Sequence, residues 1–346
     1  MLNFWEKLEA PIIGLAPMDG ITDASFRHIV CKYSRPSFVM TEFTNVEGLA
    51  RGAVKMLKAF IYEESERPII AQIYGIEPDS FYKAAVMLAQ LGFDGIDINM
   101  GCPAQKVSKR GSGAGLIKTP ELAKNLINMT KKGIEDWANG ISLEKAGVHE
   151  DIIAAVKEIR PEEPERKSIP VSVKTRIGYE EETAEEWAKH LLETNPAAII
   201  MHGRTLKQMY LGEANWDVLA RASAIVRANN VKFIGNGDIK SMEQAEEYIR
   251  KYEVDGVLIG RGALGNPWFF SKKAPGSTEK HKIAYEHCKF LEDNFSNSSK
   301  EWRKIPFYAV KKHLGWYCKG FEGAKELRMK LMEAENSDEV KKILKI

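Results

Sequence analysis

One thiol in this chain stands where it could take part in chemistry. Cys102 lies in the segment INMGCPAQKVSKRGSGAGL, at the end of an apolar run, and is followed by Pro103 and a glycine-spaced basic loop. A free cysteine is commonly buried and inert. A thiol with an unperturbed pKa of about 8.5 is also mostly protonated at neutral pH, so at the end of a strand it can serve as a proton donor.

Polar residues close nearly every apolar run of the sequence. If these runs are strands of a parallel barrel, their C-terminal ends are where an active site would lie. A random soluble domain would not place such a residue on each strand. The residues that close the runs are Met18, Asp19, Glu42, Gln72, Asn99, Cys102, Lys174, Arg176, His202, Arg204, Asn236, Asp238, Gly260 and Arg261.

Two glycine-containing turns late in the chain are suited to a phosphate group. The segments NGD at 236–238 and GRG at 260–262 place glycines directly before predicted helices, after the last two runs. Barrels bind phosphates at these two positions through backbone N–H groups. Arg261 can add a charged fork to the phosphate. Either turn alone is equally well explained by the general role of glycine in turns, but the pair favours a phosphate site.

The apolar runs predict eight buried parallel strands. They begin at residues 11, 37, 68, 94, 169, 197, 231 and 255, and most begin 24 to 34 residues apart. The segments between them, such as SFYKAAVMLAQLG, have helical periodicity. A doubly wound sheet would also alternate strands and helices, but eight units with polar strand ends favour a (β/α)8 TIM barrel.

One interval between strands is much longer than the others. The stretch between the runs at 94 and 169 is charged in its second half and contains one further helix-like segment. We assign residues 133–166 to an insertion in a barrel loop. An inserted arm near a face of the barrel would be a candidate for contact with a partner.

The chain changes character after the segment GRGALGNPWFF. Lys-rich helical segments follow without strand signals, and SKKAPGSTEK is the predicted linker. Residues 272–346 carry 17 Lys and Arg against 11 Asp and Glu, a net charge of +6, whereas residues 1–271 have a net charge of −4. We therefore predict a barrel domain over 1–271 and a small all-helical domain over 272–346, and we expect the tail to be separable from the strand-end site.

The bulk composition is that of a globular protein. The chain has 346 residues, of which 44% are hydrophobic and 28% are charged, and no apolar run approaches the roughly 18 residues of a membrane span. Its four cysteines are far apart and form no CxxC pair, which argues against a disulfide framework or a metal site. We expect a cytoplasmic protein with reduced thiols.

Eight motifs together resemble those of the tRNA-dihydrouridine synthase family. They are APMDGITD (16–23), QIYG (72–75), DINMGCP (97–103), KRGSGAGL (109–116), VKTRIG (173–178), HGRT (202–205), NGDI (236–239) and GRGALGNPW (260–268). They span nearly the whole predicted barrel, and DINMGCP together with HGRT is highly specific. The tail KKHLGWYCKGFEGAKELR is similar to the helical domain of the bacterial B-type members.

The resemblance implies a reaction and a set of site residues. In this family NADPH or NADH reduces bound FMN, and the flavin then reduces the C5–C6 double bond of a uridine in folded tRNA. By the family pattern Cys102 is the general acid that gives its proton to C5, and Asn99 contacts the uracil. The residues implied to contact FMN are Ala16, Pro17, Met18, Gln72, Lys174, His202, Asn236, Gly237, Asp238, Gly260 and Arg261.

Two of these assignments also agree with side-chain chemistry. A positive charge on Lys174 suits a place beside an anionic reduced flavin, although a salt-bridged barrel lysine is the alternative. The amide of Gln72 suits the edge of a heterocycle that alternates carbonyl and N–H groups. We interpret His202 as a flavin contact, against the structural role that a lone histidine more often has.

The substrate of such an enzyme lies inside a folded RNA, so the target base must be swung out into the mouth of the barrel. Basic side chains around the mouth are then candidates for phosphate contacts, and the basic tail is a candidate for gripping the tRNA body. The alternative for each side chain is a solvated rim. The candidates are Lys106, Lys109, Arg110, Arg176 and Arg204.

Two other functions fit part of the pattern. An FMN barrel that reduces a free small molecule, as dihydroorotate dehydrogenase-like or old-yellow-enzyme-like reductases do, would share the phosphate site and Lys174. It would leave the basic helical tail unexplained. A non-catalytic tRNA-binding protein would not need Cys102 or a full set of flavin-contacting residues.

Overall fold

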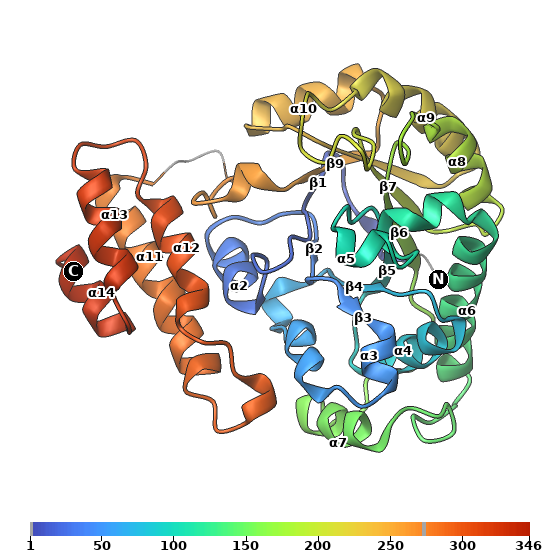
Figure 1. The fold of residues 1–346 in the computed structure, drawn as a ribbon, viewed down its shortest axis with the longest axis horizontal. Helices are drawn as coiled ribbons and strands as arrows, with labels where there is room; N and C mark the ends of the chain where they lie inside the picture. The colour runs from blue at the N-terminus through green and yellow to red at the C-terminus, as the bar shows by residue number, and fades with distance from the viewer. Residues whose placement is uncertain (1–2, 272–274) are drawn as a thin grey trace.

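Eight parallel strands close into a barrel in the computed structural model, which describes residues 3–271 and 275–346 (Figure 1). β1 pairs with both β9 and β2, and β2 pairs with β4, so the sheet closes on itself. A short additional strand, β3 (Thr44–Asn45), continues the line of β2 along β4. The predicted TIM barrel is confirmed. Its strands are β1 (Ile12–Leu15), β2 (Val39–Met40), β4 (Ile69–Tyr74), β5 (Gly95–Met100), β6 (Val171–Arg176), β7 (Ala198–His202), β8 (Lys232–Asn236) and β9 (Gly256–Ile259).

The strands are apolar on both faces because both faces are covered. Side chains such as Ile70, Ile200 and Leu258 fill the interior of the barrel, and Trp5 of the short helix α1 (Phe4–Lys7) joins this cluster. The alternate side chains point outward and pack under the surrounding helices in the largest hydrophobic cluster. Continuous apolar runs are therefore what this fold requires of its strands.

Helices follow the strands in alternation and cover the outside of the barrel. Polar caps begin several of them: Asp23, Asn215 and Ser241 each accept a backbone N–H from the first turn of α2, α9 and α10. Because the strands are parallel, the loops that lead from strand ends to helices gather at one end of the barrel. The helices are α2 (Ala24–Tyr33), α3 (Val46–Ala50), α4 (Pro78–Gln90), α6 (Pro120–Ala138), α8 (Ala184–Leu192), α9 (Trp216–Ala228) and α10 (Met242–Lys251).

The insertion expected at 133–166 is placed differently by the structure. Residues 133–138 are the last part of α6, and only the stretch after it, with α7 (Glu150–Ile159), is additional. This stretch joins the end of a helix to the start of β6, so it lies at the N-terminal ends of the strands. Its side chains Ile152 and Val156 are part of the main core. The insertion therefore belongs to the base of the barrel and is not an arm beside the strand-end loops.

The C-terminal helices have a hydrophobic core that they share with the barrel. They lie beside α2 (Figure 1), and their cluster includes Ala24 and Ile29 of α2 and Trp268 after β9. The predicted boundary between 271 and 272 borders residues 272–274, which are outside the described part of the chain. The helices are α11 (Ser277–Leu291), α12 (Tyr308–Tyr317), α13 (Ala324–Glu333) and α14 (Ser337–Leu344). Among the residues described, no helix is both long and apolar enough to span a bilayer.

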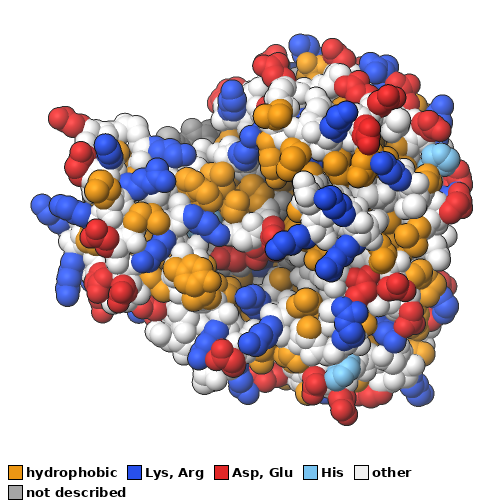
Figure 2. Space-filling model, in the orientation of Figure 1, with side chains coloured by type: hydrophobic (Ala, Val, Ile, Leu, Met, Phe, Trp, Pro, Cys, Tyr) orange, Lys and Arg blue, Asp and Glu red, His pale blue; other side chains and the backbone are white. Residues whose placement is uncertain are grey.

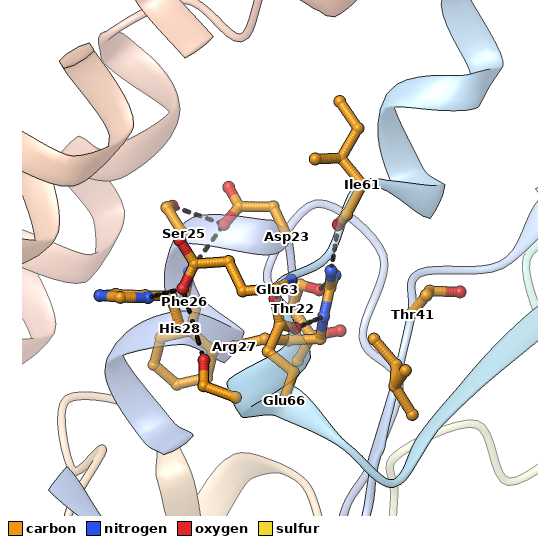
Figure 3. Close-up of polar contacts among 12 residues, drawn as sticks. Thr22, Asp23, Ser25, Phe26, Arg27, His28, Thr41, Ile61, Glu63 and Glu66 are labelled. Carbon is orange, nitrogen blue, oxygen red and sulfur yellow. Dashed lines mark hydrogen bonds and ion pairs between the residues drawn. The ribbon is translucent and has the colours of Figure 1, made fainter. Parts of the chain in front are cut away.

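A buried ion pair fastens α2 to the segment that precedes β4 (Figure 3). Arg27 Nε donates to Glu66 Oε2 at 2.7 Å, and both side chains are almost completely buried. Two further guanidinium N–H groups donate to the carbonyl oxygens of Thr22 at 2.9 Å and Ile61 at 2.7 Å. Burial raises the pKa of Glu66, and the charge of Arg27 opposes this rise. Arg27 therefore stabilises a carboxylate that the barrel would otherwise bury alone.

We expect Arg27→Met to lower the free energy of unfolding by about 3 to 5 kcal/mol, because it leaves Glu66 buried without its cation. Without Arg27 the pKa of Glu66 rises further above its value in the unfolded chain, so stability is lost as the pH rises. The deficit should therefore be larger at pH 8 than at pH 5 in urea denaturation. The double variant Arg27→Met/Glu66→Met is the control and should lie closer to wild type. A single variant as stable as the double would contradict this account.

Candidate active site

A cavity of about 1350 Å³ opens at the C-terminal ends of the strands. Its wall receives side chains from the end of every barrel strand except β4. On the face drawn in Figure 2, Lys and Arg side chains surround a hollow between the barrel and the C-terminal helices. The described residues include no cluster of three or more His, Cys, Asp or Glu side chains that could hold a metal ion.

Most residues predicted from the strand ends line this cavity. Those that do are Ala16, Pro17, Met18, Asp19, Asn99, Cys102, Lys174, Arg176, His202, Arg204, Asn236, Gly237, Asp238, Gly260 and Arg261. Five predicted residues are not part of the lining, namely Glu42, Gln72, Lys106, Lys109 and Arg110. The last three are exposed on the short helix α5 (Gln105–Ser108) and in the turn that follows it, next to the mouth-side loop of β5.

Buried amides hold the backbone of Cys102 from below. Asn99 Oδ1 accepts the N–H groups of Cys102 at 2.9 Å and Gly101 at 3.1 Å. The Asn99 amide nitrogen donates to Gln72 Oε1 at 3.0 Å, and Gln72 Nε2 donates to Asp97 Oδ2 at 2.8 Å. Each amide thus donates toward Asp97, whose carboxylate is the final acceptor. Gln72 is completely buried and is not part of the cavity lining; it orients Asn99, and its contact with the cofactor stays a prediction.

The thiol of Cys102 lies in the cavity wall in a partly buried position. Burial raises the pKa of this thiol, and a hydrogen bond with the backbone of Ala104 opposes the rise only in part. The thiol is therefore protonated at neutral pH, which is the state that a proton donor needs. Gly113 lies directly behind it at φ +57°, and a Cβ there would come within 3.0 Å of the Cys102 carbonyl oxygen. Glycine at this position lets the basic loop pack onto Cys102.

Polar side chains from β6, β7 and β8 form a second wall. Lys174 Nζ donates to Asn236 Oδ1 at 3.2 Å. Burial, and then the charge of Arg176, lower the pKa of Lys174 to about 8, so the ammonium is still mostly charged at pH 7. Burial, followed by Arg176, also holds the pKa of His202 well below its ordinary value, so this ring is neutral. Lys174 therefore presents a cation beside the two neutral hydrogen-bonding side chains of His202 and Asn236.

The turns after β8 and β9 meet at Asp238. Its Oδ1 accepts from Arg261 at 2.8 Å, and its Oδ2 accepts from Arg204 at 2.6 Å and from the N–H of Ala214 at 2.8 Å. Burial alone would raise the pKa of Asp238, but these donors hold it below its ordinary value. Gly237 has φ +142°, and a Cβ there would lie 2.4 Å from that of Ala214. A glycine turn and an oriented arginine therefore stand side by side.

Arg176 and Arg204 were expected on a rim that holds phosphates, but their side chains are 3% and 2% exposed. Arg176 donates to backbone carbonyl oxygens at 2.8 to 2.9 Å, those of Gly101, Thr205 and Met209. Arg204 donates in the same way to Leu211 at 3.2 Å and Gly212 at 2.6 Å. Both arginines line the cavity, but most of their donors hold the backbone of the loop between β7 and α9.

That loop exposes an aromatic side chain that sequence analysis missed. Tyr210 is 59% exposed between Met209 and Leu211, which are 43% and 76% exposed. Its ring centroid lies 6.0 Å from the guanidinium carbon of Arg176 and 5.7 Å from that of Arg261. Exposed aromatic faces beside cations are suited to stacking against nucleobases. Tyr210 lies well beyond the end of β7, so the strand-end pattern gave no signal for it.

The chain matches the model of the dihydrouridine synthase family over residues 14–138 and 142–346. A Staphylococcus aureus (strain COL) protein named probable tRNA-dihydrouridine synthase is 33% identical over 347 residues, covering 99% of this chain and 94% of the relative. A Bacillus subtilis (strain 168) protein named probable tRNA-dihydrouridine synthase 2 is 33% identical over 351 residues, with coverages of 99% and 95%.

Solved structures show a more distant likeness. One of them, a crystal structure of DHODH from Eimeria tenella in complex with ferulenol, is 12% identical with a TM-score of 0.47 and covers 82% of each chain. A likeness this low says nothing about activity. The family model and the two relatives, in contrast, confirm the resemblance carried by the motifs. This chain therefore belongs to the dihydrouridine synthase family, whose members are flavin-dependent oxidoreductases that act on tRNA.

Proposed function

We propose that this protein is a tRNA-dihydrouridine synthase that binds FMN in the strand-end cavity and reduces the C5–C6 double bond of uridines in tRNA, with NADPH or NADH as reductant. The observation that supports it best is a partly buried thiol, that of Cys102, in the wall of a cavity suited to a flavin mononucleotide. A reductase of free small molecules would share the cavity, but it would not account for the exposed aromatic and basic side chains beside the mouth.

The residues of the cavity suit FMN in size and chemistry. A volume of about 1350 Å³ exceeds the roughly 300 to 1,000 Å³ of most ligand pockets, which leaves room for a cofactor and a nucleobase together. Gly237 and Gly260 allow close approach of a phosphate, and Arg261 offers it a charge oriented by Asp238. Lys174 would place a cation beside the isoalloxazine ring. When bound, the flavin supplies the hydride that adds to C6 of the uracil.

Cys102 would then complete the reduction by protonating the uracil. Hydride addition at C6 leaves negative charge at C5 and O4, and proton transfer from Sγ to C5 removes it. Burial raises the pKa of the Cys102 thiol and so keeps it protonated until the proton is transferred to the uracil. The backbone N–H of Cys102 donates to Asn99, which Gln72 orients in turn, so the thiol is presented from a rigid strand end.

The rim of the cavity suits a uridine that has left its RNA stack. The exposed ring of Tyr210 offers a stacking face at the mouth. Lys106, Lys109 and Arg110 are exposed on the neighbouring loop and are placed to contact phosphates. The C-terminal helices, with their excess of positive charge, would hold the body of the tRNA.

Cys102→Ala should separate the two half-reactions. Reduction of the flavin by NADPH should persist, because it does not use the thiol. Reoxidation by tRNA should fall by a factor of about a hundred to ten thousand, the usual contribution of a positioned general acid. Stopped-flow absorbance of the flavin measures both steps. Alanine at Cys31, Cys288 or Cys318 is the control and should leave both rates near wild type, and a wild-type rate for Cys102→Ala would exclude this thiol as the donor.

The pH dependence of alkylation tests the protonation state directly. A raised pKa means less thiolate at any pH below it, so Cys102 should react with iodoacetamide at least about threefold more slowly than a cysteine in an unstructured peptide at pH 8. Its rate should continue to rise above pH 9. Peptide mapping by mass spectrometry assigns the modified residue. A rate that levels off below pH 8 would show a stabilised thiolate and would contradict the role of acid.

Arg261→Ala should weaken retention of FMN by about ten- to a hundredfold, the contribution of a hydrogen bond to a charged group. Flavin fluorescence during dilution of the loaded protein measures the dissociation constant. Arg221→Ala is a matched control, because Arg221 and Arg261 have the same side-chain exposure of 56% and each pairs with one carboxylate. Equal retention in the two variants would remove Arg261 from the phosphate site.

A further inference from the structure

Helix α12 packs against the backs of two loops whose front sides line the cavity. Lys312 Nζ lies 3.5 Å from where a Cβ on Gly20 would stand, and the carbonyl oxygen of Trp316 would lie 2.2 Å from a Cβ on Gly265. The first loop contributes Met18, Asp19 and Ile21 to the cavity, and the second contributes Leu264. The C-terminal helices therefore support part of the cavity wall from behind.

A chain of buried hydrogen bonds joins α11 and α12 to the first of these loops. The hydroxyl of Tyr317 lies 3.0 Å from His287 Nδ1, and His287 Nε2 lies 3.2 Å from Ser25 Oγ. Ser25 Oγ donates to Asp23 Oδ1 at 2.6 Å (Figure 3). Ser25 and His287 are completely buried, and Asp23 and Tyr317 are 6% and 5% exposed. In this setting each lost partner leaves a buried polar group unsatisfied.

The direction of each bond follows from the chemistry of Asp23. Its carboxylate can only accept, so the hydroxyl proton of Ser25 points toward it, and Ser25 Oγ accepts the proton of His287 Nε2. His287 is then the tautomer whose Nδ1 accepts from the Tyr317 hydroxyl. Burial lowers the pKa of His287 to about 4, in agreement with a neutral ring. All donors thus point from the helices toward the loop.

Asp23 connects this chain to the cavity. The same Oδ1 atom accepts the N–H of Phe26 at 2.9 Å and so begins α2. The preceding residue, Thr22, accepts the N–H of Met18 on its hydroxyl oxygen at 2.9 Å, which closes the loop on itself. Met18 lines the cavity. A displacement of Asp23 would therefore also move Met18 and the part of the cavity wall that Met18 forms.

His313 supports the same loop by packing. Its buried ring lies against Phe26 with centroids 4.7 Å apart, and against His287 at the same distance. Neither ring nitrogen has a hydrogen-bond partner of good geometry, although the backbone of Ile21 lies close enough to favour the protonated ring. Burial still holds the pKa of His313 well below its ordinary value. His287 is thus the histidine that makes a directed link to the loop.

We propose that His287 is a positioning residue for the loop at 18–23, acting through Ser25 and Asp23, so that the C-terminal helices are required for the geometry of the cavity as well as for holding tRNA. What the cavity binds rests on the proposed function, but the link to the loop does not. The sequence predicted a tail separable from the strand-end site. The shared core and the hydrogen-bond chain instead make removal of residues 275–346 disruptive to the cavity.

His287→Leu and His287→Gln form the test pair. Leucine keeps an apolar side chain but removes both hydrogen bonds, whereas glutamine keeps an Nε2 donor toward Ser25. With the flavin-loaded protein, hydrogen–deuterium exchange in the peptide 18–26 should be about tenfold faster in His287→Leu and near wild type in His287→Gln. Reoxidation at saturating tRNA should fall about ten- to a hundredfold in the leucine variant, with the tRNA dissociation constant unchanged, because the loop is misplaced while the RNA-binding surface is intact.

Tyr33→Phe is the matched control. The Tyr33 hydroxyl donates to Glu286 at 2.6 Å and so joins the same two helices, α2 and α11, at the end of α2 that is distant from the loop. It should leave both measurements at wild-type values. Exchange of 18–26 that is unchanged in His287→Leu, or equally fast in Tyr33→Phe, would overturn the proposal.

Ser25→Ala breaks the same link from the barrel side without altering the C-terminal helices. Ser25→Ala should show the same faster exchange of the peptide 18–26. If His287→Leu does not fold, Ser25→Ala takes its place as the test, and exchange at the wild-type rate would overturn the proposal. If instead the proposed function is wrong, the results differ from both of these outcomes. The wild-type protein would then neither retain FMN nor reduce tRNA, while exchange of the loop would still depend on His287.

Discussion

Closure of the parallel sheet is the constraint on which the rest of the structure depends. Since β2 pairs with β4 and β1 with β9, eight strand ends meet on one rim. Side chains that are far apart along the chain, such as Met18, Cys102 and Arg261, therefore line one cavity. Because the strands are parallel, every helix-to-strand connection returns at the opposite end, and the long stretch containing α7 is one of these connections.

Inside this rim, two carboxylates organise the polar side chains, and one of them, Asp97, is completely buried. Asp97 accepts from Gln72 and Ser172 at 2.8 Å each, and although burial raises its pKa to about 6, it is still ionised at pH 7. Asp238 accepts from Arg204 and Arg261 at the opposite wall. Each carboxylate fixes the direction of the donors around it. The Gln72 amide and the guanidinium groups of Arg204 and Arg261 are therefore each held in one orientation. Fixed donors of this kind can stabilise charge that develops on a bound molecule.

Features that depend on local sequence pattern were predicted correctly. How deeply a side chain lies and which partners it faces were not. The eight strands and most of the polar cavity residues at their ends were predictable, because a polar residue that closes an apolar run is visible in the sequence. The depth of Gln72 was not, since only the register of β4 against β5 places it beneath Asn99. Besides Asp238, Arg204 has two backbone carbonyl oxygens of a loop as partners, which no residue type reveals. Tyr210 was missed because that same loop carries it to the mouth.

The relation between the barrel and the basic helices shows most clearly why composition alone was misleading. Residues 272–346 differ from the rest of the chain in net charge. Charged side chains lie mostly at the surface, so this difference says little about the interior. Burial concerns the interior, where Ile29 and Trp268 belong to the same cluster as the C-terminal helices. A surface that holds RNA and a wall that holds a cofactor can thus be two faces of one packed unit. Ser25 and His287 connect the C-terminal helices to the cavity loop through hydrogen bonds. A hydrogen bond fixes the orientation of the two groups as well as their distance, whereas an apolar contact fixes only the distance.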